Sequence, residues 1–216
     1  EIAGNEIVHG GFAEFKPQDI SNVLWSFATL KFKHVSLFEA ASNECMNRKF
    51  HGFIPQDMSN ILWSFATLKI SNVELFHFAM NECMARDLHD FDSQQISNIL
   101  WACASVEIVQ IPFFLAIGKE CVRRDVQDFN SQALSITCWS FATAHIPENE
   151  LFHCIARTCL NRNCNDCDPQ ALSNLVWCVA SVKISHRELF GAVTHECIER
   201  GFNDFLPQHL SMLLWS

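Results

Sequence analysis

The sequence contains no tyrosine and few residues that break helices. Only 7 of its 216 residues are glycine and 6 are proline, too few for the many tight turns of an all-β protein. Charged residues make up 18% of the chain and hydrophobic residues 49%, which excludes an intrinsically disordered chain. Basic residues are also in the minority: 15 Lys and Arg against 24 Asp and Glu give a net charge of −9. That sign argues, on its own, against a nucleic-acid partner.

Long apolar runs are absent as well. The longest stretch without Asp, Glu, Lys or Arg runs from Phe129 to Pro147, and it contains Ser, Thr, Asn, Gln and His. A bilayer-spanning helix needs about 20 mostly apolar residues, so we expect no membrane partner. The chain begins at Glu1 without a Met or a signal-peptide pattern, and we expect it to be cut from something longer.

A repeat of 38 residues explains the composition. One Trp occurs in each unit, and columns of Gln, Ser, Phe, Cys and Arg follow the same step. The Trp column consists of Trp25, Trp63, Trp101, Trp139, Trp177 and Trp215. Dividing 216 by 38 gives about 5.7 units. We expect residues 1–216 to form one array, in which 1–12 end a preceding unit and 207–216 start a further one. Neither end is a polar cap, so we expect more repeats on both sides.

Each unit is predicted to form two helices. In the first unit, helix A is expected over residues 17–30 and helix B over 36–50. Pro17 and its equivalents suit the first helical position, while Asp92, Asn130 and Asp168 suit the N-cap. Helix B carries Glu–Arg pairs four residues apart, as in Glu44–Arg48. The sequence therefore predicts an all-α fold, a right-handed α-solenoid of 38-residue helix-turn-helix repeats.

Helix A has an arc of short polar side chains along one side. In the first unit, Asp19, Asn22, Ser26 and Thr29 share this arc, because they are spaced by three, four and three residues. Two interpretations stay open. Small polar side chains allow tight packing of neighbouring helices, or they form a concave row that contacts RNA bases, one base per repeat. The change of residue at position 19 and its equivalents (Asp, Asp, Gln, Ala, Ala, His) favours base contact.

The Trp column also has two interpretations. A repeated Trp can be a platform on which bases stack, or it can hold neighbouring repeats together. Trp25 lies among Leu24, Phe27 and Ala28, so we expect the column to belong to the core.

The run from Pro17 to Leu30, PQDISNVLWSFATL, recurs every 38 residues and resembles the octotricopeptide repeat. Related helical repeats occur in apicomplexan heptatricopeptide proteins, FAST-kinase-like proteins and subunits of the kinetoplastid RNA-editing substrate-binding complex. The resemblance covers essentially the whole chain. It implies sequence-selective binding of organellar transcripts, for their processing, stability, editing or translation, in a mitochondrion or chloroplast. The acidity departs from this pattern, and no C-terminal RAP domain follows the repeats, so nuclease activity has no support.

The eleven Cys residues fit the repeat without disulfides or metal. Five form the helix B column, and the others replace small or apolar residues, so we expect free thiols that pack as small hydrophobes. Cys164 and Cys167 form a single CxxC pair, a weak zinc signal. We expect no metal and no cofactor. No nucleophile–base pair or phosphate loop stands out, so we do not expect an enzyme.

The sequence thus favours a single-stranded RNA-binding array, with other proteins of an RNA-processing complex as further candidate partners. A protein-binding scaffold with no RNA contact is the alternative, which the acidity favours. The predicted base contacts are Asp19, Asn22, Ser26, Asp57, Asn60, Ser64, Gln95, Asn98, Ser140 and Asn174. Three lysines at the ends of helices A, Lys31, Lys69 and Lys183, are the predicted phosphate contacts.

Overall fold

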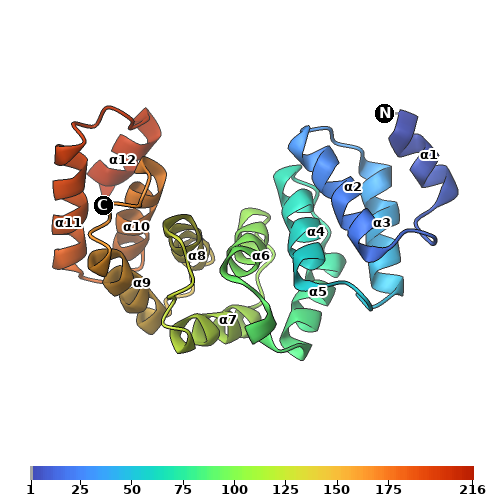
Figure 1. The fold of residues 1–216 in the computed structure, drawn as a ribbon, viewed down its shortest axis with the longest axis horizontal. Helices are drawn as coiled ribbons and strands as arrows, with labels where there is room; N and C mark the ends of the chain where they lie inside the picture. Colours follow the sequence, from blue (N-terminus) through green and yellow to red (C-terminus); the bar gives the residue numbers. More distant parts are fainter. Residues whose placement is uncertain (1) are drawn as a thin grey trace. The chain divides into compact units, whose positions relative to one another are not determined.

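The computed structural model describes residues 2–216, and none of them lies in a β-strand. Figure 1 shows the helices in chain order. Their bounds are α1 (Ile2–Gly10), α2 (Pro17–Thr29), α3 (Val35–Asn47), α4 (Pro55–Thr67), α5 (Val73–Ala85), a short 3₁₀ helix (Leu88–Asp90), α6 (Ser93–Ser105), α7 (Ile111–Arg123), α8 (Ser131–Thr143), α9 (Asn149–Asn161), α10 (Pro169–Ser181), α11 (Arg187–Glu199) and α12 (Pro207–Trp215). The predicted helices A and B both form, within three residues of the expected bounds.

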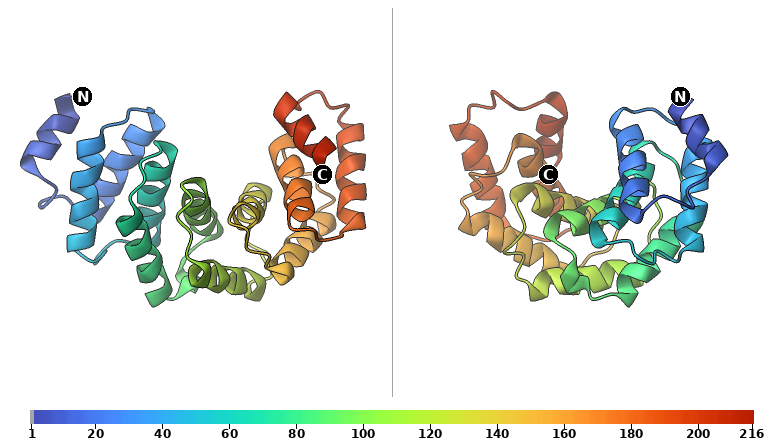
Figure 2. Two further views of the ribbon diagram at one scale, coloured as in Figure 1. Left: turned by 180° about the vertical axis from the view of Figure 1, so that it is seen from behind. Right: turned by 45° about the vertical axis from the view of Figure 1, so that its right-hand side comes forward.

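The chain divides into two compact units, unit 1 (Glu1–Phe113) and unit 2 (Phe114–Ser216). In unit 1 the helices A are α2, α4 and α6, and they pack side by side. The helices B α3 and α5 pack beside each other in a second layer. In unit 2, α8, α10 and α12 pack in the same way, and α9 packs beside α11. The views in Figure 2 show these pairs from other sides. The predicted all-α helical-repeat fold is confirmed. Its right-handedness and the single array over residues 1–216 stay predictions.

Apolar side chains between the two layers hold each unit together. In unit 1 the rings of Phe38 and Phe65 meet edge to face, with centroids 4.9 Å apart. Unit 2 has an equivalent pair, Phe114 and Phe141, at 5.3 Å. All four side chains are at most 1% exposed. Burying each contributes about 1.5–3 kcal/mol, so these Phe pairs help to hold one helix B against the next helix A.

The helix ends follow a common design. Asp92, Asn130 and Asp168 each accept a hydrogen bond from the backbone N–H three residues later, at 2.7–2.8 Å, which confirms the predicted N-caps. At the other end of each helix A, one residue adopts the left-handed conformation. Lys31, Lys69 and Lys183 do so with φ of 53°, 51° and 58°. Bonds from Lys31 N to Ala28 O and from Phe32 N to Phe27 O complete a Schellman motif.

An arginine at the C-cap of helix B joins one repeat to the repeat before it. Arg86 donates to the carbonyl oxygens of Phe53 and Phe50, at 2.5 and 3.0 Å. Arg162 donates in the same way to Phe129 and Gln127, at 2.7 and 3.2 Å. These bonds satisfy carbonyls in the turn between helix B and the next helix A. Sequence analysis predicted only the Glu–Arg pairs of the same helix.

Candidate nucleic-acid interface

One face of each helix A is open to solvent. On α4 it holds Gln56, Asn60, Trp63 and Thr67, which are spaced by four, three and four residues and therefore lie on one side of the helix. Gln56 is exposed, while the other three are half-buried. The Gln residues equivalent to Gln56 are exposed in all six repeats. The sequence shows them as one column of the repeat, but their residue type alone did not identify them as candidate RNA contacts.

Positions 26 and 19 of the repeat lie largely between neighbouring helices A. Ser64 and Ser140 are 0% exposed, and their hydroxyls donate to the carbonyls of Asn60 and Ile136 at 2.6 and 2.8 Å. Asp57 is 4% exposed. Neighbouring side chains cover these three residues, so their burial argues against base contact, which stays a prediction for them. Their positions fit the packing interpretation.

The carboxylate of Asp57 has a structural task. It accepts a hydrogen bond from the Ser21 hydroxyl of α2 at 2.8 Å and another from the Ile54 backbone N–H at 3.1 Å. It thus connects two helices A and closes the first turn of α4. In α2 the equivalent residues Asp19 and Ser26 are exposed. Among the described helices A, α2 is the one in which both positions are exposed.

Position 22 is the part of the polar arc that remains accessible in unit 1. Asn22 is exposed, and Asn60 and Asn98 are half-buried. In unit 2 this position holds Ile136 and then Asn174, which is 8% exposed. The structure therefore keeps Asn22, Asn60 and Asn98 at the surface and removes Asn174 from it.

A small polar pocket of about 130 Å³ lies between α4 and α6. We call it the amide pocket, and its lining residues are Gln56, Ser59, Asn60, Asp92, Gln94, Gln95 and Asn98. Three predicted base contacts, Asn60, Gln95 and Asn98, are thus brought together in one place. The side-chain amides of Gln56, Asn60, Gln94 and Asn98 make no hydrogen bond to another described residue. No Lys or Arg lines the pocket, so it offers hydrogen bonds rather than positive charge.

The Trp side chains are not part of the buried core, which corrects the sequence interpretation. Trp25 and Trp215 are 46% and 64% exposed, and the other four are half-buried. In unit 2 the rings of Trp177 and Trp215 lie 6.3 Å apart and are tilted by 40°. The column therefore packs neighbouring helices A together while leaving indole surface open on the accessible face.

The hydroxyls four residues after the Trp side chains lack partners. Within the described chain, the oxygens of Thr67, Thr143 and Ser181 are buried and make no hydrogen bond, and Thr137 Oγ1 shares this state. A buried hydroxyl without a partner costs about 1–3 kcal/mol. The three therefore leave hydrogen-bonding capacity unused beside the accessible face of helix A.

The predicted phosphate contacts are accessible. Lys31, Lys69 and Lys183 are exposed, and their ammonium groups make no ion pair within the part of the chain that the structure describes. The carbonyl of Lys69 accepts a hydrogen bond from the Lys33 ammonium at 3.1 Å, which places a second cation near the end of α4. Contact with phosphate stays a prediction.

The arginines, by contrast, are engaged. Arg48 pairs with Glu44 at 2.6 Å and also donates to Phe15 O and Phe12 O, both at 2.8 Å. Where Thr158 replaces the Glu, Arg162 lies 3.8 Å from Asp166 instead. These side chains are fixed by the repeat and supply little free positive charge.

All eleven Cys residues are buried and free, as predicted. Burial raises the pKa of the Cys45, Cys83 and Cys121 thiols to about 12, so these groups stay neutral at physiological pH. No cluster of three or more His, Cys, Asp or Glu suited to a metal is found among residues 2–216. None of the described helices combines the length and apolarity that a membrane crossing needs.

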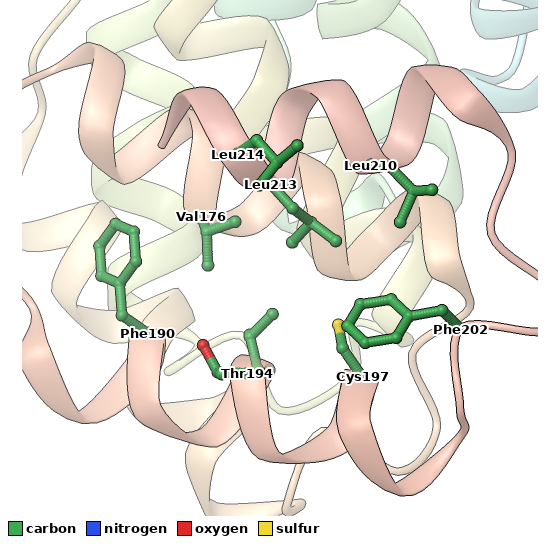
Figure 3. Close-up of a pocket in the computed structure, with 9 residues that line it drawn as sticks. Val176, Phe190, Thr194, Cys197, Phe202, Leu210, Leu213 and Leu214 are labelled. Atoms are coloured by element: carbon green, nitrogen blue, oxygen red, sulfur yellow. The ribbon is translucent and has the colours of Figure 1, made fainter.

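A second, apolar pocket of about 420 Å³ lies in unit 2. In Figure 3, Leu210, Leu213 and Leu214 of α12 face Phe190, Thr194 and Cys197 of α11 across this space. Phe202 also lines it and is equivalent to Phe50 of unit 1, whose ring lies 6.1 Å from Phe78 of the next helix B. The pocket is therefore a stretch of repeat core that a further helix covers in unit 1.

The family comparison agrees with the resemblance that the repeat suggests. The model of a family described as RNA-editing substrate-binding complex 6 protein matches residues 12–187, well over half of the chain. No curated protein matches the chain. The family match supports the resemblance to RNA-editing substrate-binding complex subunits. The narrower octotricopeptide classification stays a prediction.

Proposed function

Because the chain belongs to the RNA-editing substrate-binding complex 6 protein family, we propose that it binds single-stranded RNA as part of an RNA-editing complex. The family description names an RNA substrate and a complex, so both RNA and protein partners follow from it. We further propose an organellar, mitochondrial setting on the strength of the family alone. The proposed role is binding, without a catalytic step.

The amide pocket is the observation that carries direct RNA contact. Amide side chains offer both donors and acceptors, and sequence-selective proteins contact unstacked bases through such groups. One pocket of about 130 Å³ contains four amides without partners. Because they make no hydrogen bond within the described fold, their amide groups are available to a ligand. The accessible Trp63 and Trp101 lie on the same two helices and provide surfaces for base stacking.

The pocket predicts the effect of removing its amides. Replacing Asn60 and Asn98 with Ala should lower the affinity for a randomised single-stranded RNA pool by about tenfold or more, at about 1 kcal/mol per lost hydrogen bond. The melting temperature should not fall, because these amides have no partner in the fold. The matched control is Asn81→Ala, an exposed Asn on α5, which should leave RNA affinity unchanged.

A salt series tests whether the contact is with RNA at all. Binding should weaken linearly on a logarithmic salt scale, with a shallow slope because few cations are free. Absence of measurable binding to the pool at low salt would refute direct RNA contact. The same affinity in the double variant and the wild type would show that the amide pocket is not the site.

A protein-binding scaffold is the second candidate function. The net charge of −9 favours it, because an acidic surface suits a protein partner better than RNA. The two functions are compatible in one subunit of a complex. The RNA pool experiment separates them, since a scaffold alone binds no RNA.

A further inference from the structure

We propose that the amide pocket between α4 and α6 accepts a base that carries an exocyclic amine and disfavours uracil. This inference rests on the proposed RNA-binding function and adds the class of base. The pocket is lined by amide side chains, Ser59 and one carboxylate, with no cation. An uncharged, hydrogen-bonding group fits such a lining, whereas a phosphate does not.

The side chain that sets the preference is Asp92, the only charged residue of the lining. Its Oδ1 accepts a hydrogen bond from Gln95 N at 2.7 Å, and its own N–H donates to Gln95 Oε1 at 3.1 Å. This reciprocal pair fixes the carboxylate at the start of α6. Its second oxygen, Oδ2, makes no hydrogen bond to another described residue, so one acceptor is held at the pocket without a donor.

A carboxylate oxygen accepts hydrogen bonds and cannot donate them. Adenine, cytosine and guanine each present an exocyclic amine that can donate to it, and Asp is an established partner of the cytosine amine. Uracil carries a carbonyl oxygen where cytosine carries the amine. At that position two acceptors then face each other, so uracil gains no hydrogen bond to Asp92 Oδ2 there, and the exposed carboxylate stays hydrated. The amides of Asn60 and Asn98 adapt to either base, so Asp92 determines the difference.

Asp92→Asn is a sharp test because Asn caps a helix as well as Asp does. The variant keeps the fold but replaces the acceptor with a group that can also donate. The matched control is Asp168→Asn in unit 2. Asp168 caps α10 through the same bond, to Ala171 N at 2.7 Å, and its substitution removes the same single charge. Equal melting temperatures would show that both variants fold.

The probes are fluorescently labelled oligo(C) and oligo(U) of equal length, titrated at one low salt concentration. These homopolymers differ at the position of the exocyclic amine. The wild type and Asp168→Asn should bind oligo(C) about fivefold or more tighter than oligo(U). In Asp92→Asn the ratio should fall to about two or less, mainly through tighter binding of oligo(U).

Each of the other outcomes would contradict one part of the proposal. Equal wild-type affinity for the two oligomers would refute the base preference and leave RNA binding intact. A preference that survives in Asp92→Asn, or that is lost equally in Asp168→Asn, would refute the role of Asp92. Binding of neither oligomer would refute the base preference together with the proposed function.

Discussion

Units 1 and 2 share one framework but differ in what they present on helix A. Unit 1 holds Asn60 and Asn98 at the accessible position, and the amide pocket lies between their helices. Unit 2 holds Ile136 and the buried Asn174 at the same position. A pocket in unit 2 is apolar and lies between α11 and α12. The proposed base contacts therefore lie in unit 1, where the amide side chains are accessible.

The framework residues show why such a difference is tolerated. The Phe pairs between layers occur in both units, at 4.9 and 5.3 Å. The Arg bonds to backbone carbonyls also occur in both. Because these contacts fix the helices, the accessible position of helix A is free to change without loss of the fold. Stability and recognition therefore depend on different columns of the repeat.

The largest effect that we expect tests the shared framework. Arg86→Ala removes the bonds to Phe53 O and Phe50 O and leaves Glu82 unpaired. We expect a loss of about 3 kcal/mol in the free energy of unfolding. In unit 2, Arg162→Ala should cost about 2 kcal/mol, because Thr158 replaces the Glu partner. Urea denaturation measures both losses.

The control for these variants is Arg157→Ala. Arg157 pairs with Asp125, but the two side chains are 61% and 50% exposed, so the loss of stability should be much smaller than for Arg86→Ala. If Arg86→Ala were no more destabilising than this control, the Arg column would not hold the repeats together.

A smaller effect should separate the two units through their Trp side chains. Trp63→Ala and Trp139→Ala each remove a half-buried indole, and each should cost about 2 kcal/mol of stability. RNA affinity should fall further for Trp63, because base stacking contributes about 1–3 kcal/mol and Trp63 lies one turn after Asn60. Melting curves and RNA titrations below the lower melting temperature measure the two effects. Equal losses of RNA affinity would remove the distinction between the units.

Most of the fold could be predicted from the sequence because it repeats. The 38-residue step located both helices of each unit, and the caps at Asp92 and Asp168 followed from residue type alone. The bonds of Arg86 could not be predicted, since their acceptors are backbone carbonyls that carry no sequence signal. The burial of Ser64 and the exposure of the Trp column depend on the distance between neighbouring helices A, which a helical wheel does not give.

The site was predicted only in part, because the sequence does not show how neighbouring helices A lie against each other. Asn60, Gln95 and Asn98 were identified as polar residues at variable positions, and they do line one pocket. Gln56 and Gln94 were missed although their column is constant, because base contact was sought at positions that change between repeats. Asp92 was identified as a helix cap, and its place in the amide pocket becomes apparent only when α4 lies beside α6.

The smallest effect concerns the left-handed residue at the end of helix A. Lys69 and Lys183 hold φ of 51° and 58°, which costs a side chain about 1 kcal/mol more than glycine. Lys69→Gly and Lys183→Gly should therefore each raise stability by about 0.5–1 kcal/mol. If RNA lies along unit 1, Lys69→Gly alone should lower RNA affinity and reduce the salt slope by about 1. Since the two effects of Lys69→Gly have opposite signs, weaker RNA binding could not result from unfolding. Equal salt slopes for both variants and the wild type would show that neither lysine contacts phosphate.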